Sequence, residues 1–127
     1  MRYLCLIHLD EKALRAIPED ELSALHGAHL DFNDGLRDTG HFIVAEALEP
    51  ASAAKCVRVR QGKSTVTDGP FTESKEVIAG FYLIEARDLQ EATEIAANIP
   101  SARTGLGTVE VRPARQLEVK DREPRWG

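Results

Sequence analysis

Residues 3–9, YLCLIHL, carry the pattern of the chain that is most informative about its fold. Apolar side chains occupy both sets of alternating positions, with Tyr3, Cys5, Ile7 and Leu9 on one face and Leu4 and Leu6 on the other. A strand that is apolar on both faces belongs in the middle of a sheet, with a covering layer on each side. The pattern therefore predicts a central strand around which the rest of the chain is arranged.

A long helix is predicted after this strand. Pro18 is tolerated in a first helical turn, and the acids of residues 19–21 are favourable at the positive end of the helix dipole. The helix is expected to run to about Arg37, with Gly40 as its stop signal.

The remaining elements are mostly strands. They are expected at residues 41–48, 55–60, 64–67, 77–86 and 108–114. Asp88 and Glu91 form a capping box for a second helix over residues 89–99, which Pro100 ends. This order predicts an α+β fold of the ferredoxin-like type, an antiparallel sheet with two helices on one face.

Two helices cannot cover both faces of such a sheet. We therefore expect a homodimer that packs sheet against sheet, in a dimeric α+β barrel arrangement. One domain is predicted over residues 1–117, followed by a charged C-terminal tail over residues 118–127.

Composition narrows the classes of partner. The 127 residues carry a net charge of −5, which argues against nucleic acid as a partner. The longest apolar run is far shorter than the about 20 residues of a membrane span, and no signal peptide is evident. Cys5 and Cys56 are interpreted as small buried thiols, which predicts a cytoplasmic location.

The first helix contains the most informative polar residue. Its apolar face is made of residues at spacings of three and four: Leu22, Leu25, His29, Phe32 and Leu36. His29 is either a core histidine with one hydrogen bond or a general acid or base in a pocket between helix and sheet. In the second case His26 and Asn33, on or beside the same face, are candidate ligand-binding residues.

Acidic residues of the run at 68–76 are the second candidates. Asp68 is expected either to bond the backbone in a turn or to lie at the pocket mouth as the catalytic partner of His29. Glu73 belongs either to a solvated face or to the ligand site, and Arg112 is a further candidate ligand-binding residue. No histidine pair has the spacing of a metal site, so neither a metal nor a cofactor is expected.

Six segments together resemble the bacterial YCII-related proteins of the DGPF subgroup, over about residues 1 to 115. They are DGPFTESKE (68–76), AGFYLIEA (79–86), DLQEATEIAANIP (88–100), VEVRPA (109–114), YLCLIHLDE (3–11) and GAHLDFNDGLRDTG (27–40). The resemblance implies a dimeric ferredoxin-like fold without a settled activity. YCII-type proteins have been proposed to pair a helix histidine with an aspartate. His29 matches that histidine, but the aspartate position falls at Ile99, which cannot act as an acid.

Two functions of different classes follow. The first is a homodimer that binds a small organic ligand near His29, with general acid–base chemistry through that residue. The alternative is a non-catalytic sensing or protein-interaction module, because DGPF-type proteins are often encoded beside sigma factors. A third, a cofactor-free oxygenase or isomerase, rests on analogy of fold alone. An enclosed His29 with a polar neighbour favours the first, and a dry His29 with an exposed apolar patch elsewhere favours the second.

Overall fold

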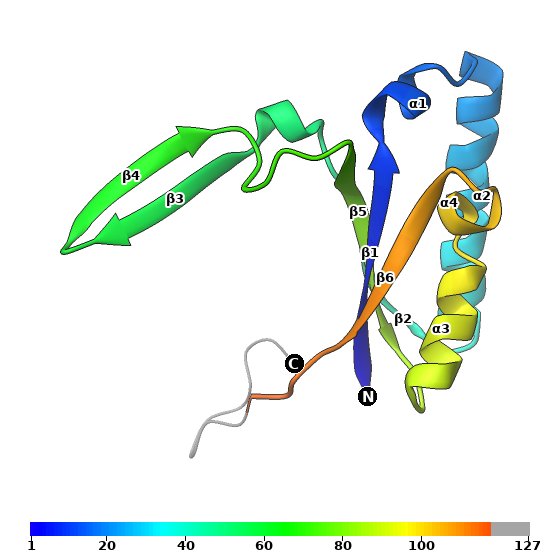
Figure 1. The fold of residues 1–127 in the computed structure, drawn as a ribbon. Coiled ribbons are helices and arrows are strands. Elements are labelled where there is room, and N and C mark those ends of the chain that lie inside the picture. The colour runs from blue at the N-terminus through cyan, green and yellow to red at the C-terminus, as the bar shows by residue number, and fades with distance from the viewer. Residues whose placement is uncertain (118–127) are drawn as a thin grey trace.

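A four-stranded antiparallel sheet forms the body of the protein in the computed structural model, which describes residues 1–117 (Figure 1). The strand order is β2-β5-β1-β6. The four strands are β1 (Arg2–Asp10), β2 (Phe42–Ala47), β5 (Glu76–Glu85) and β6 (Gly107–Pro113). The doubly apolar strand β1 is thus internal, as predicted, and the βαββαβ order with this strand arrangement matches the expected α+β architecture.

Helices cover one face of the sheet, and the other face carries none (Figure 1). The two longer helices are α2 (Glu19–Asp38) and α3 (Leu89–Ala97), close to their predicted limits. The expected capping box closes the start of α3: the backbone N–H of Glu91 donates to Asp88 Oδ1 at 2.9 Å, and the Glu91 carboxylate accepts from the backbone N–H of Arg87 at 3.0 Å.

Two short α-helices and the 3-10 helix η1 (Ala51–Ala53) were not predicted from the sequence. The segment after β1 was expected to be a loop, but α1 (Glu11–Arg15) forms there, because Asp10 Oδ1 accepts the backbone N–H of Lys12 as an N-cap. Pro100 ends α3 as expected, but it also begins α4 (Pro100–Arg103), since proline is well suited to a first helical turn.

The core lies between the helices and the sheet. Its fully buried side chains come from β1, β5 and α3 and from the residues after α3: Cys5, Ile84, Ala92 and Ile99 are each 0% exposed. The side chains of β1 on this face are all buried, whereas Leu4 and Leu6 on the helix-free face are only half-buried. The described protomer therefore covers one apolar face of β1 and leaves the other partly open.

The predicted hairpin forms, but outside the main sheet. Strands β3 (Lys55–Arg60) and β4 (Lys63–Asp68) pair only with each other and make a separate two-stranded sheet. We call residues 55–68 the arm. It follows the short helix η1 (Ala51–Ala53) and projects away from the sheet on the helix-free side (Figure 1).

One sequence prediction falls on residues that the structure does not describe. The predicted charged tail, residues 118–127, lies outside the described residues. In the part that is described, no helix is both long enough and apolar enough to cross a membrane.

Cys5 and Cys56 are both free thiols, and burial raises the pKa of Cys5 to about 11.

Candidate functional site

The side chain of His29 extends from α2 toward β5 and α4, and a hydroxyl group lies at hydrogen-bond distance from each of its ring nitrogens. Its Nδ1 is 2.9 Å from Tyr82 Oη, and its Nε2 is 2.9 Å from Ser101 Oγ. Tyr82 and Ser101 are 3% and 4% exposed, whereas the imidazole between them is half-buried. The ring is therefore fixed in orientation from both sides.

The arrangement follows from the helical spacing of α2. The face that carries His29 turns toward the sheet, where Phe32, one turn on, packs edge-on against the Tyr82 ring with centroids 5.7 Å apart. Tyr82 points to the helix side of β5, and Ser101 is placed by α4, which packs against α2. Three separate elements thus converge on one imidazole.

Burial keeps this imidazole neutral at physiological pH. The pKa of His29 is lowered from its ordinary value of 6.5, first by burial and second by the charge of His26 on the same helix. Burial raises the pKa of Tyr82 to about 12, so its hydroxyl stays protonated. A neutral imidazole has one N–H and one lone pair, and can therefore accept or return a proton.

A cavity of about 460 Å³ opens beside His29, between α2 and the strands β2 and β5. Its walls are mostly apolar and include Leu14, Leu25, Leu30 and Ala47. The volume is within the range of pockets for small organic ligands, and an apolar wall with a few polar groups is typical of them.

Asn33 and His26 line the same cavity. The side-chain oxygen Oδ1 of Asn33 is buried and has no hydrogen-bond partner in the structure. An unpaired buried acceptor is costly, so a bound molecule that donates a hydrogen bond to it would remove that cost. The structure thus brings three of the predicted site residues, His26, His29 and Asn33, to one cavity.

The other three predicted site residues do not line this cavity. Asp68 is at the base of the arm, with its carboxylate 2.5 Å from Lys55 Nζ and its side chain 85% exposed. Glu73 is exposed in the loop before β5, and Arg112 is exposed on β6, opposite Leu4 on the helix-free side of the sheet. Neither Asp68 nor Glu73 contacts His29, so the imidazole partners in this chain are hydroxyls instead.

Tyr82 and Ser101 are the residues that sequence reasoning missed. Tyr82 has the alternation of a core strand position, and its hydroxyl gives no signal of a partner in the sequence. Ser101 follows Pro100, which the sequence predicts only as the end of a helix. A buried histidine needs hydrogen-bond partners for its ring nitrogens. This requirement was the one signal in the sequence that such partners exist. Within residues 1–117, no group of three metal-ligating side chains is present.

The fold is similar to that of a solved enzyme, 5-chloro-2-hydroxyhydroquinone dehydrochlorinase from Burkholderia phenoliruptrix AC1100 in complex with 2,5-dihydroxybenzoquinone. The similarity has a TM-score of 0.54 and 18% sequence identity, and covers 91% of this chain and 95% of that chain. At this identity the likeness concerns the fold.

Sequence similarity is closer to an uncharacterized protein of Rhizobium meliloti (strain 1021). The two chains are 33% identical over 120 residues, which is 89% of this chain and 91% of that protein. The YCII-related domain family matches residues 1–117, which is every residue that the structure describes. On this match, and on the fold and helix histidine already described, the chain belongs to the YCII-related family.

Proposed function

We propose that this protein binds a small organic ligand in the cavity beside His29 and that His29 exchanges a proton with the ligand. The observation that carries the proposal is the neutral imidazole at the wall of a ligand-sized cavity, held between two hydroxyls. A general base must be in its uncharged form at working pH, and the lowered pKa of His29 meets that condition.

The two hydroxyls define how a proton would travel. Both ring nitrogens of His29 are engaged, so a ligand reaches the imidazole either by displacing one hydroxyl or by using it as a relay. The relay runs through the hydroxyl beside the unprotonated ring nitrogen, which is Tyr82 Oη or Ser101 Oγ according to the tautomer. That hydroxyl takes the ligand proton and passes its own proton to this nitrogen. The imidazolium that results returns the proton along the same path.

The cavity also indicates the chemistry of the ligand. Its walls favour an apolar body, and Asn33 Oδ1 favours a hydroxyl or N–H donor on that body. A small hydroxylated ring compound combines these features. The ligand of the solved dehydrochlorinase, dihydroxybenzoquinone, belongs to this chemical class and serves as the first probe.

A titration of the imidazole resonances by NMR tests the proposal. His29 is expected to titrate below 6.5, because burial disfavours its charged form, and its resonances are expected to move when dihydroxybenzoquinone is added. A His29→Gln variant identifies the signals of this residue. Binding that depends on the neutral imidazole should weaken as the pH falls through the pKa of His29.

His41 provides the internal control. It lies between Thr39 and Glu91 and does not line the cavity, so the probe should leave its resonances in place. A His29 signal that fails to respond to millimolar probe would count against a ligand site of this class. An imidazole that never titrates would make His29 a packed core residue.

We further infer that the protein is a cytoplasmic homodimer of the DGPF subgroup, packed sheet against sheet in a dimeric α+β barrel. The sequence DGPF at residues 68–71 supports the subgroup. The helix-free face of the sheet supports the dimer, because Leu4, Leu6, Phe81 and Leu83 are half-buried on it and no helix covers them.

Sedimentation velocity at micromolar concentration is expected to give a dimer mass. Burial of this apolar sheet face is the driving force, so association should be retained at high salt. A monomer under these conditions would remove the homodimer from the proposal.

The second candidate function, an interaction module connected with sigma-factor regulation, has one observation in its favour. The same half-buried sheet face could receive a different protein in place of a second copy. His29 does not fit this alternative as well, since it lines a cavity and is not fully packed. Binding of the probe at His29 would favour the ligand-binding function over this one.

A further inference from the structure

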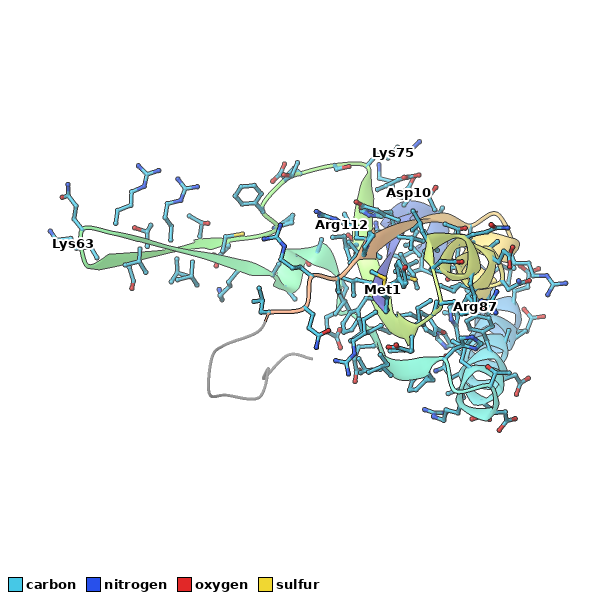
Figure 2. The ribbon with its side chains drawn as sticks, turned by 90° about the horizontal axis from the view of Figure 1, so that it is seen from below. Met1, Asp10, Lys63, Lys75, Arg87 and Arg112 are labelled. Atoms are coloured by element: carbon cyan, nitrogen blue, oxygen red, sulfur yellow. The ribbon has the colours of Figure 1, made fainter. Side chains whose placement is uncertain are left out.

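The arm is the most exposed part of the described chain. Figure 2 shows it extending far from the body, with Lys63 at its tip. Its strands have no partner in the main sheet. At its base the backbone N–H of Gly69 donates to the carbonyl of Ala54 at 2.8 Å, which joins the two ends of the arm to each other. An isolated two-stranded hairpin is at best marginally stable in water, so this arm requires further packing.

The two faces of the arm differ in chemistry. Val57 and Val66 are directly opposite each other, and Val59 lies on the same face. These valines are 66%, 56% and 61% exposed, respectively. The opposite face carries Arg58 and Arg60. Ser64 and, at the base of the arm, the Lys55–Asp68 ion pair share the valine face. The valines therefore form an uncovered apolar patch on one face, and the other face is solvated by charge.

The surface with matching chemistry is the helix-free face of the sheet, on the side to which the arm projects (Figure 1). Leu4, Leu6, Phe81 and Leu83 are half-buried there. The arm of a chain projects away from the sheet of the same chain and does not lie on it. Between the base of the arm and the sheet, the two connecting loops border a cavity of about 700 Å³. The arm can cover such a face only on another copy.

The charges of the chain favour the same contact. The arm has four cationic side chains and one carboxylate, a net charge of +3, whereas the whole chain carries −5, which leaves −8 on the rest. The helix-free face carries charges of both signs: Glu46 and Glu110 pair with Phe81 and Leu6, and Arg112 pairs with Leu4. The attraction therefore rests on the net charges of arm and body. Opposite net charges on arm and body attract an arm to the body of a second molecule.

We propose that the arm is a reciprocal clamp: in the homodimer, the arm of each copy lays its valine face on the helix-free sheet face of the other copy. The proposal rests on the homodimer inferred above. Each copy gives one arm and receives one, as a two-fold symmetric interface requires. The sheet face of one protomer is thereby closed in part by residues of the other.

The test compares two double variants of the full chain. In Val57→Thr/Val66→Thr, the shape and the β-propensity of each side chain are kept. One methyl group of each valine is replaced by a hydroxyl group. In the matched control, Thr65→Ser/Thr67→Ser, the opposite face of the same strand β4 is altered. Dimer dissociation constants are measured by sedimentation at graded concentrations, after circular dichroism has shown that both variants are folded.

The valine variant is expected to dissociate about 100-fold more readily, because each dimer loses four buried methyl groups. The control should stay within about twofold of the unaltered chain, since its face is solvated. A dissociation constant that the valine variant leaves unchanged would overturn the clamp while the homodimer stood. A chain that is monomeric before any substitution would overturn both.

Hydrogen exchange offers a second measurement that needs no variant. The backbone N–H groups of the arm are expected to be protected in concentrated samples and to exchange faster on dilution to monomer, because the valine face is then uncovered. Arm amides that exchange equally fast at all concentrations would contradict the clamp even if the sheet faces associate.

Discussion

Replacement of His29 by alanine is expected to weaken binding of dihydroxybenzoquinone by at least about tenfold and to leave the protein folded. The substitution removes the only imidazole that contacts both Tyr82 and Ser101, and with it the group that would exchange a proton with the ligand. A general base contributes about 10²- to 10⁴-fold to a rate, and loss of its hydrogen bond weakens binding by at least about tenfold. Calorimetric titration of the variant with the probe measures the effect.

Two further variants make the result specific. In Ser101→Ala the imidazole keeps Tyr82 Oη, so affinity is expected to fall less than in His29→Ala. In His41→Ala an imidazole is removed at the far end of α2, outside the cavity, and affinity should not change. Equal binding by His29→Ala and the unaltered chain would exclude His29 from the site.

Replacement of Gly80 by alanine is expected to destabilise the fold by about 2 kcal/mol and to lower the melting temperature by about 8 °C. Gly80 lies inside β5 between β1 and β2, and a Cβ atom there would lie 2.8 Å from the carbonyl oxygen of Glu46. The obstructing atom belongs to the backbone of a paired strand, so it cannot move aside without loss of ladder hydrogen bonds. Thermal unfolding followed by circular dichroism gives the comparison.

Gly35→Ala is the matched control and is expected to have the opposite sign. Gly35 is in the interior of α2, and among the described residues nothing outside its own stretch of helix lies within 4 Å of the position its Cβ would take. Alanine in a helix interior stabilises by roughly 0.5–1 kcal/mol relative to glycine. A Gly80→Ala variant that melts with the unaltered chain would show that β2 can move away from β5, and that the close approach is not required.

The prediction for Gly80 illustrates what a sequence can indicate locally. A glycine inside an otherwise strong strand suggests a bulge or a close backbone approach. Both occur here: the β1–β5 register shifts between Ile7 and His8, beside Gly80, and Glu46 O approaches on the other side. The sequence did not indicate which strand would make that approach.

The arm shows where the local pattern was insufficient. Alternating residues in 55–60 correctly predicted a strand and its hairpin partner, but the same alternation suits a strand inside a sheet or outside it. Both edges of β5 are occupied, by β1 and β2, so the hairpin has no place beside that strand. The hairpin pairs with neither β2 nor β6, the edge strands of the sheet, so its valines stay exposed. No stretch of the arm encodes this outcome.

By itself, the sequence determined the central position of β1, the strand and helix order, the face of α2 that carries His29 and the capping of α3. Each is set by the chemistry of residues only a few positions apart, through periodicity and local hydrogen bonding. Only the tertiary structure decided which groups meet His29: Tyr82 and Ser101 are 53 and 72 residues away along the chain. Such partners depend on how β5 and α4 pack against α2. That packing is a property of the whole core, so the candidate acids Asp68 and Glu73 could be proposed from the sequence, whereas the hydroxyls that contact the imidazole could not.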